Sequence, residues 1–207
     1  SAFSQSTKKV SRSETYTKER YFVLKANKKI KHGSYVKINR ETNKVEEEGQ
    51  YDMGRKVGVW NYYDYSSELI QKFNYDDSTI IYDIELISPA TDVFYSLKSH
   101  HKILDKPPLA IGGTRLFFYN VSRSLHYLEG TGVGKVTVSV LIHENGKMGS
   151  SNIIKTTCKK CNVEVMKAVD SQSYQWIPAE KDGQHVSCEM TFIITIKPPR
   201  SLLVEVE

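Results

Sequence analysis

Three cysteines are the residues of this chain best suited to chemistry. Cys158 and Cys161 form a C-x-x-C motif with two lysines between them, and Cys188 stands alone. One such pair without a second is weak evidence for zinc. The motif falls where a strand is expected to pass into a helix, as in a thioredoxin-type redox site. In an oxidising compartment we favour a local Cys158–Cys161 disulfide over redox activity.

The other candidate groups do not build a catalytic or cofactor site. His100 and His101 are adjacent, and neighbours in a strand point to opposite faces, so we expect no metal site there. Residues 130–134, Gly-Thr-Gly-Val-Gly, lack the Gly-Lys-Ser/Thr ending of a phosphate loop and precede a strand. No Ser, His and acid set has the spacing of a triad. We therefore expect a non-enzymatic protein without a cofactor.

The composition predicts a folded chain that does not bind nucleic acid. The 207 residues are 39% hydrophobic and 11% aromatic, enough to bury a core. No stretch approaches the roughly 20 apolar residues of a membrane span. The net charge of +5 arises in residues 1–50, where 12 Lys and Arg face 6 Asp and Glu; the rest of the chain holds 17 against 18. The basicity therefore belongs to the leading segment alone.

Residues 1–19 are interpreted as an export-signal remnant and a basic lead-in. The small residues Ser1 to Gln5 resemble the end of a secretory signal peptide of the Bacteroidetes, and an ordinary chain terminus is the alternative. The ten Lys and Arg between Lys8 and Lys37 are typical of a solvated face. Attraction to an anionic membrane or cell wall is the other possibility.

Residues 20–90 have the pattern of short β-hairpins. Aromatic and polar residues alternate around Gly49–Asp64, and Gly occurs where the chain must turn. The pattern recurs, because Gly33 and Tyr35 lie 25 residues before Gly58 and Trp60. Over residues 20–78 these repeats resemble MORN-type repeats, in a variant often labelled antitoxin-like. Packing between hairpins is the expected role of the aromatic residues, and the alternative is a ligand surface made of Tyr51, Trp60, Tyr62 and Tyr63.

Residues 105–198 have the pattern of an α+β domain, which residues 199–207 follow as a tail. An amphipathic stretch over 114–128 predicts a helix. Residues 134–143 alternate with period two, and Asn145-Gly146 predicts a hairpin into a second strand over 148–157. Asn162 is a plausible N-cap for a second helix. A final strand follows, with alternate residues from Val186 to Ile196 on one face.

This series resembles the C-terminal domain of TonB-type energy transducers, particularly the form common in Bacteroidetes. The resemblance covers residues 105–197 and implies an antiparallel sheet with helices on one face and no catalytic centre. A right-handed crossover over 148–196, with the last strand beside the first and antiparallel to it, predicts three strands in the order 2-1-3 and two helices. The resemblance also implies docking on outer-membrane receptors by adding a partner's segment to an exposed strand edge. The matching residues are Pro107-Pro108, Ile111-Gly112-Gly113, Gly132 to Val136, Ile142, Asn145-Gly146-Lys147, Ala168-Val169, Trp176-x-Pro178-Ala179, Asp182-Gly183 and Val186.

In a 2-1-3 sheet the last strand is an edge, open to a partner strand. Glu189, Thr191, Ile193 and Thr195 are expected to point away from the core and to contact that partner. The alternative is an edge covered by the N-terminal hairpins or by a second copy of the protein. The second and last strands run parallel, so Cys188 lies at the opposite end of the sheet from the C-x-x-C motif and is expected to be a buried free thiol.

The leading hypothesis is an exported, periplasmic protein that recognises another protein of the cell envelope, partly through the strand at 186–196. Its partner is an outer-membrane receptor or a second copy. Two alternatives remain: a glycan or peptidoglycan ligand held by the aromatic hairpins, or a cytosolic antitoxin-like binding protein. The chain departs from a TonB transducer in having hairpins where that family has a Pro-rich spacer.

Overall fold

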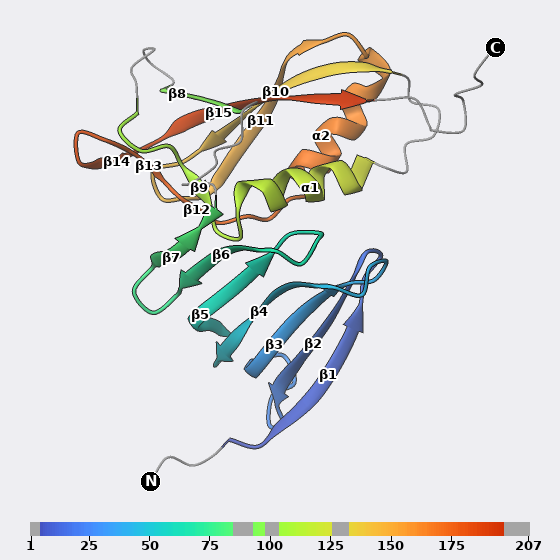
Figure 1. The fold of residues 1–207 in the computed structure, drawn as a ribbon, viewed down its shortest axis with the longest axis vertical. Helices are drawn as coiled ribbons and strands as arrows, with labels where there is room; N and C mark the ends of the chain where they lie inside the picture. Colours follow the sequence, from blue (N-terminus) through green and yellow to red (C-terminus); the bar gives the residue numbers. More distant parts are fainter. Residues whose placement is uncertain (1–4, 85–92, 98–103, 126–132, 197–207) are drawn as a thin grey trace, which may run out of the picture. The chain divides into compact units, whose positions relative to one another are not determined.

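The computed structural model describes residues 5–84, 93–97, 104–125 and 133–196, and the chain divides into two compact units, Ser1–Pro89 and Ala90–Glu207 (Figure 1). Three sequence predictions concern residues outside these ranges: the export remnant at 1–4, the pair His100-His101 and the tail at 199–207. The same holds for most of the Gly-rich stretch 130–134. Within the described ranges, neither helix has the length and apolar character needed to cross a membrane.

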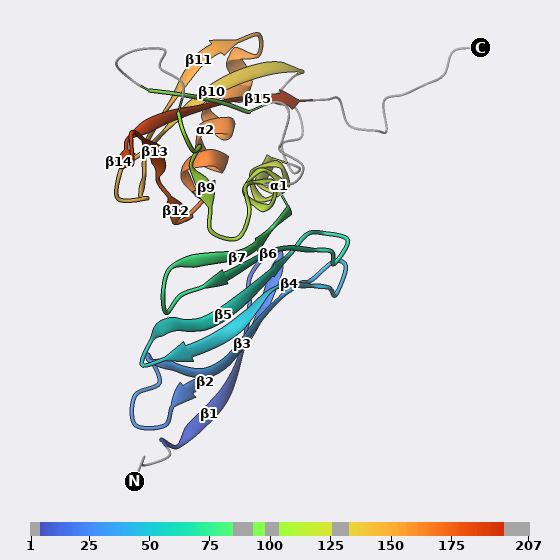
Figure 2. The same ribbon diagram turned by 60° about the vertical axis from the view of Figure 1, so that its left-hand side comes forward.

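The N-terminal unit is a seven-stranded antiparallel meander in which every strand pairs with its neighbours in the sequence (Figure 2). The prediction of antiparallel hairpins is confirmed, but the expected lead-in is itself the first strand of the sheet and part of the second. The strands are β1 (Thr7–Ser13), β2 (Thr17–Leu24), β3 (Lys31–Asn39), β4 (Val45–Asp52), β5 (Arg55–Tyr63), β6 (Leu69–Asn74) and β7 (Thr79–Asp83).

One face of this sheet is filled by its own aromatic side chains. Trp60 is completely buried, and its ring lies 5.4 Å from that of Tyr35 and 5.2 Å from that of Tyr51 between ring centroids. Gly49 of β4 makes this packing possible, since a Cβ atom there would lie 2.3 Å from ring carbons of Trp60. Residues 25 positions apart in the predicted repeat, Tyr35 and Trp60, are therefore direct neighbours in space.

The C-terminal unit contains a four-stranded antiparallel sheet of order β11-β10-β15-β8. The predicted 2-1-3 arrangement is present as β11-β10-β15, but the prediction of three strands is wrong because a fourth strand lies beside the last one. The main strands are β8 (Val93–Ser96), β10 (Gly134–Ile142), β11 (Met148–Thr156) and β15 (Cys188–Ile196). The smaller elements are the strand pairs β9 (Leu109–Ala110) with β12 (Trp176–Ile177), and β13 (Ala179–Lys181) with β14 (Gln184–Val186).

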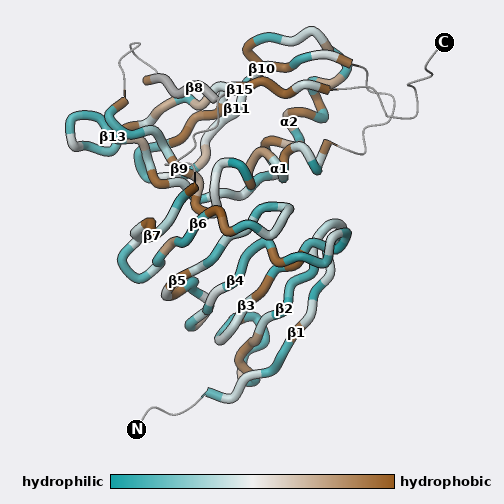
Figure 3. The backbone as a smooth tube through the Cα atoms, in the orientation of Figure 1, coloured by the Kyte–Doolittle hydropathy of each residue, from teal (hydrophilic) through white to brown (hydrophobic). Residues whose placement is uncertain are grey.

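Two helices, α1 (Thr114–Leu125) and α2 (Asn162–Asp170), cover one face of this sheet, as predicted (Figures 1 and 2). Hydrophobic residues are spaced two apart along β10 and β15, so they lie on a single face of the sheet, the one that packs against the helices. Figure 3 shows the hydrophobic residues of these two strands in brown. The core is formed by residues of both helices and of the sheet, including Phe117, Val121, Val136, Val138, Val140, Ile142, Val165, Val169, Met190 and Phe192.

The predicted N-cap of α2 is wrong. Asn162 is the first helical residue rather than the cap, and Cys161 takes the cap position without a side-chain hydrogen bond. The reason is the short 3-10 turn Lys159–Cys161, in which Cys161 N–H donates to the carbonyl of Cys158 and leads the chain directly into the helix.

Candidate protein-binding edge and disulfide of the C-terminal unit

The last strand, β15, presents two different faces. Cys188, Met190 and Phe192 are buried against the helices, at 0%, 0% and 2% exposure. The alternate residues Glu189, Thr191, Ile193 and Thr195 lie on the other face, where Glu189 and Thr191 are half-buried and Ile193 and Thr195 are exposed. The sequence alternation thus places the four predicted partner-binding residues together on the face away from the core.

The outer edge of β15 is occupied over half its length. β8 pairs with it antiparallel, with Glu189 opposite Ser96 and Phe192 opposite Val93. The expectation that β15 is an edge strand is therefore wrong over Glu189–Phe192. The prediction failed because of a tertiary contact: β8, a four-residue strand almost a hundred positions earlier in the chain, pairs with this part of β15.

The other half of β15 keeps an open edge. Ile193–Ile196 pairs with β10 on one side, and no strand of the described ranges pairs with it on the other. Ile193 is 49% exposed, so its apolar side chain is open to a partner. Four residues of backbone and one apolar side chain are therefore available to a partner strand.

The opposite edge of the sheet, β11, is less suited to strand addition. Its pairing with β10 is interrupted by register shifts at Thr137/Val138 and at Val140/Ile142. Such irregularities twist a strand, and a twisted strand pairs less readily with an added partner strand. The smooth register of β15 with β10, unbroken from Cys188 to Ile196, leaves β15 as the better template.

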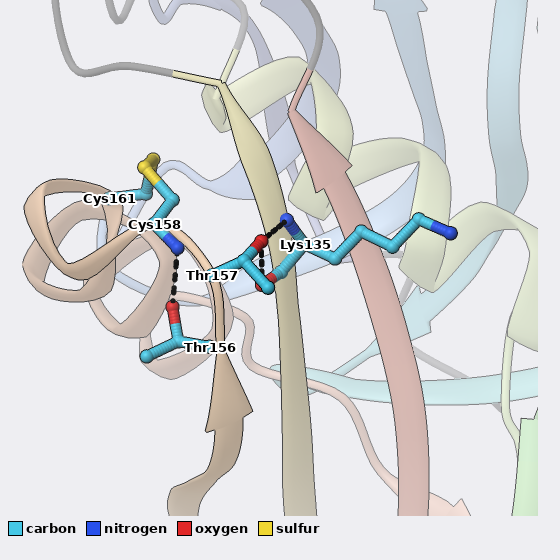
Figure 4. The surroundings of a disulfide bond; sticks show 5 residues. All are labelled: Lys135, Thr156, Thr157, Cys158 and Cys161. Atoms are coloured by element: carbon cyan, nitrogen blue, oxygen red, sulfur yellow. Dashed lines mark hydrogen bonds between the residues drawn. A yellow bond between two sulfur atoms is a disulfide. The ribbon is translucent and has the colours of Figure 1, made fainter.

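The Cys158–Cys161 disulfide closes the turn between β11 and α2 (Figure 4). Cys158 N–H donates to Thr156 Oγ1 at 3.0 Å. Thr157 ties the same turn to β10, because its Oγ1 accepts from Lys135 N–H at 2.9 Å. The disulfide and these hydrogen bonds hold the start of α2 against the first residues of β10.

Cys188 is a fully buried free thiol at the start of β15. It lies opposite Ile142, at the end of β10 remote from Gly134, which the Cys158 side chain approaches. Burial, with a smaller contribution from the Glu189 carboxylate, raises the pKa of this thiol to about 12. Cys188 is consequently protonated and unreactive at neutral pH.

The four aromatic residues considered as a ligand surface do not share one. Trp60 and Tyr62 are buried, and Tyr51 packs edge-on against Trp60. Tyr63 alternates to the opposite face of β5, where its hydroxyl donates to Glu48 at 2.7 Å. Their arrangement is that of a packed layer and not of a platform for stacking a ligand.

Two lysines close this aromatic layer. Lys31 Nζ lies 4.6 Å from the ring centroids of Tyr21 and of Tyr35, and Lys56 Nζ lies 3.8 Å from that of Trp60. Lys56 also forms an ion pair of 3.1 Å with Glu47. Lys31 and Tyr35 share β3, and Lys56 and Trp60 share β5 at the same four-residue spacing 25 positions later, so both pairs follow the repeat. The contact of Lys31 with Tyr21 on β2 joins two strands and carries no sequence signal.

Ionisation in this layer follows from burial and pairing. Burial chiefly, helped by the Glu47 and Glu19 carboxylates, raises the pKa of Tyr35 far above its ordinary range. Burial alone would also raise the pKa of Glu47, but Lys56, Lys37 and two hydrogen bonds outweigh it and hold that pKa below its usual value. The tyrosines are therefore neutral and Glu47 is ionised at neutral pH.

Comparison with known families bears on the C-terminal unit alone. Residues 131–197 match the model of the Gram-negative bacterial TonB protein C-terminal family. The TonB C-terminal match spans β10, β11, α2 and β12 to β15, and it confirms that part of the resemblance predicted over 105–197. The match leaves out α1, β8 and β9. No curated protein and no solved structure matches the chain.

The match supplies the broad functional class. The TonB C-terminal family is one of non-enzymatic interaction domains of the cell envelope, and residues 131–197 are similar to it. The partner-binding role of individual residues does not follow from the match. Sequence reasoning missed β8, although Val93, Phe94 and Tyr95 are residue types enriched in strands, because four residues are too short to show an alternating pattern.

Proposed function

We propose that this protein is an exported, periplasmic protein that binds another envelope protein through its TonB C-terminal-like unit. The partner adds a strand to the outer edge of β15, beginning at the open half Ile193–Ile196. The observation that carries the proposal is this unpaired stretch on the last strand of a sheet that matches the TonB C-terminal family. Strand addition uses main-chain hydrogen bonds for affinity and alternate side chains for specificity.

The face that a partner would contact has a suitable chemistry. Ile193 offers an exposed apolar anchor, and Thr195 offers a hydroxyl beside it. Glu189 and Thr191 lie on the same face, but a partner strand would reach them along the edge only by displacing β8. The partner is accordingly an extended segment with an apolar residue for Ile193, carried by an outer-membrane receptor or by a second copy of this protein.

The N-terminal meander is the second part of the proposal. Its hairpins are MORN-like repeats whose aromatic layer gives the unit its core. The contact between Tyr35 and Trp60 supports the repeat of 25 residues, as do the left-handed φ values of Gly33 and Gly58, +108° and +61°. The packed state of Tyr51, Trp60 and Tyr62 favours this structural role over a ligand surface.

A photo-crosslinking experiment in the native host tests the binding edge. A photoreactive phenylalanine analogue replaces Ile193 in the full-length protein, and a matched control carries it at Val163, an exposed aliphatic residue of α2. We expect a discrete adduct with one envelope protein, or with a second copy, from position 193 only. Equal adducts from both positions, or none from position 193, would contradict the proposal.

A further inference from the structure

The face of the N-terminal sheet opposite the aromatic layer contains a groove of about 480 Å³. Directly paired residues form one side of it, running across four strands: Arg20 on β2, Val36 on β3, Glu48 on β4 and Asn61 on β5. The volume is within the range of small-ligand sites. This groove therefore runs across the strands and not along an edge.

A second row of paired residues forms the other side. Lys9 on β1 pairs with Phe22 on β2, and Ser34 on β3 pairs with Gln50 on β4. These residues line the groove together with Val59. Phe22, Val36 and Val59 supply apolar surface, and Tyr21, Tyr35 and Gly49 complete the lining beside the polar and charged residues.

The charged side chains of the groove differ in whether they have a partner within the described ranges. Glu48 accepts from Tyr63 at 2.7 Å and from Asn61 at 3.3 Å, so its carboxylate is held within the sheet face. Lys9 and Arg20 are exposed, and neither forms an ion pair within the described ranges. The β1–β2 end of the groove is thus cationic, and the β4–β5 end carries fixed hydrogen-bonding groups.

We propose that this groove binds an acidic saccharide, with a uronate carboxylate at Lys9 and Arg20. The guanidinium group is suited to a carboxylate because its N–H groups form a planar fork. Ser34, Gln50 and the Glu48–Asn61 pair accept and donate to ring hydroxyls at the other end. Phe22 and Val36 lie under the apolar C–H face of the sugar ring.

The groove favours a saccharide over a peptide for a geometric reason. Pairing of the peptide backbone with a strand edge is one main way in which a β-sheet binds a peptide. A sheet face has no free main-chain donors or acceptors, because the neighbouring strands use them. A ligand here is therefore held by side chains only. The hydroxyl, amide and carboxylate side chains of the groove suit the hydroxyls of a sugar ring, and its apolar side chains suit the C–H face of that ring.

Calorimetric titration of the full chain with trigalacturonate tests the proposal. The matched ligand is the fully methyl-esterified trimer, which has the same length and hydroxyls without the charge. We expect the acid to bind at least about tenfold more tightly than the ester, the effect of one charged hydrogen bond. Arg20→Gln and Lys9→Gln should each remove most of that difference.

Two further variants keep the result interpretable. Lys28→Gln removes an exposed lysine from the turn after β2, outside the groove, and should leave both affinities unchanged. Gln50→Ala should weaken acid and ester by the same factor, because Gln50 contacts hydroxyls and not the carboxylate. Circular dichroism checks that each variant is folded.

The outcomes separate clearly. Equal affinity for acid and ester, an equal effect of Arg20→Gln and Lys28→Gln, or no binding of either trimer at millimolar concentration would each overturn the proposal. Tighter binding of hexaglutamate than of trigalacturonate would also overturn it, by assigning the groove to acidic peptides. None of these results bears on the β15 edge, which lies in the other unit.

Discussion

Gly49 and Trp60 pack in direct contact on neighbouring strands of the N-terminal sheet. The indole ring lies over Gly49, donates from Nε1 to the Gln50 carbonyl at 3.2 Å and is completely buried. Gly49→Ala places a methyl group against the ring, so either the indole or β4 must move. We expect a loss of about 2 kcal/mol in the free energy of unfolding, measured by urea denaturation.

Gly58→Asn is the matched control for that substitution. A Cβ atom at Gly58 meets nothing within 4 Å, and asparagine accepts the left-handed φ of +61° better than other side chains. This variant should lie within about 0.5 kcal/mol of the natural protein. Equal losses from the two variants would show that contact with Trp60 does not explain the Gly49 result.

The lowered pKa of Glu47 predicts how the stability of this sheet depends on pH. Its folded-state pKa lies below the ordinary value of about 4.3, despite burial, because of Lys56 and Lys37. The ionised carboxylate therefore stabilises the fold fully above about pH 4.3, and this contribution is lost as the pH falls through the folded-state pKa. The natural protein should exceed Glu47→Gln in stability most at pH 7 and progressively less towards pH 3.

Urea titrations at pH 7, 5, 4 and 3 measure that difference. Trp60 fluorescence in a Trp176→Phe background reports the N-terminal unit alone, since these are the two tryptophans of the chain. A difference between Glu47→Gln and the parent that stays constant across this range would show that Glu47 acts through packing and not through its charge.

At the scale of elements, β8 and a partner strand compete for the same edge of β15. β8 holds Glu189–Phe192, and the proposed partner begins at Ile193. Successive N–H groups of a strand point to opposite sides. Only one of Phe94 and Tyr95 therefore donates to β15, and a proline at that position removes the hydrogen bond. One of Phe94→Pro and Tyr95→Pro should therefore raise the yield of the Ile193 crosslink, several-fold.

The same two variants control for each other. The variant whose N–H points away from β15 keeps the pairing and should leave the crosslink yield unchanged. If both substitutions lower the yield, β8 supports the binding edge and does not block it. The proposed partner would then pair with β15 beyond the end of β8 while β8 stays in place.

At the scale of the whole molecule, each unit has its own core and its own tryptophan. Trp60 is buried in the N-terminal sheet and Trp176 in the C-terminal unit. Reduction of Cys158–Cys161 opens a four-residue loop in the C-terminal unit, and loop entropy predicts a loss of about 2 kcal/mol there. We expect the urea transition reported by Trp176 to move on reduction while that reported by Trp60 stays.

Trp60→Phe and Trp176→Phe variants, each measured with and without dithiothreitol, separate the two signals. Cys158→Ser/Cys161→Ser should reproduce the effect of the reductant and make the protein insensitive to it. A shift of both transitions together would indicate that the units unfold as one, against the division of the chain at residues 89 and 90.

Local sequence patterns account for the individual elements of this protein. Period-two alternation predicted β10 and β15, Asn145-Gly146 predicted the turn between β10 and β11, and Asp182-Gly183 takes the left-handed φ values of a tight hairpin turn, +50° and +74°. These features depend on residues close in the chain, where propensity and hydrophobic period act directly. The face to which each β15 side chain points follows from the same alternation.

Which edges and surfaces remain open depends instead on contacts between distant parts of the chain. β8 covers half of β15, Lys31 and Lys56 close the aromatic layer, and Lys9, Arg20 and Gln50 meet in one groove from three different strands. Except for Lys56 and Trp60, which share β5, these contacts join residues from separate strands. A short segment such as Val93–Ser96 becomes a strand only through its partner. Pairing between strands is a property of the assembled sheet, and no local pattern encodes it.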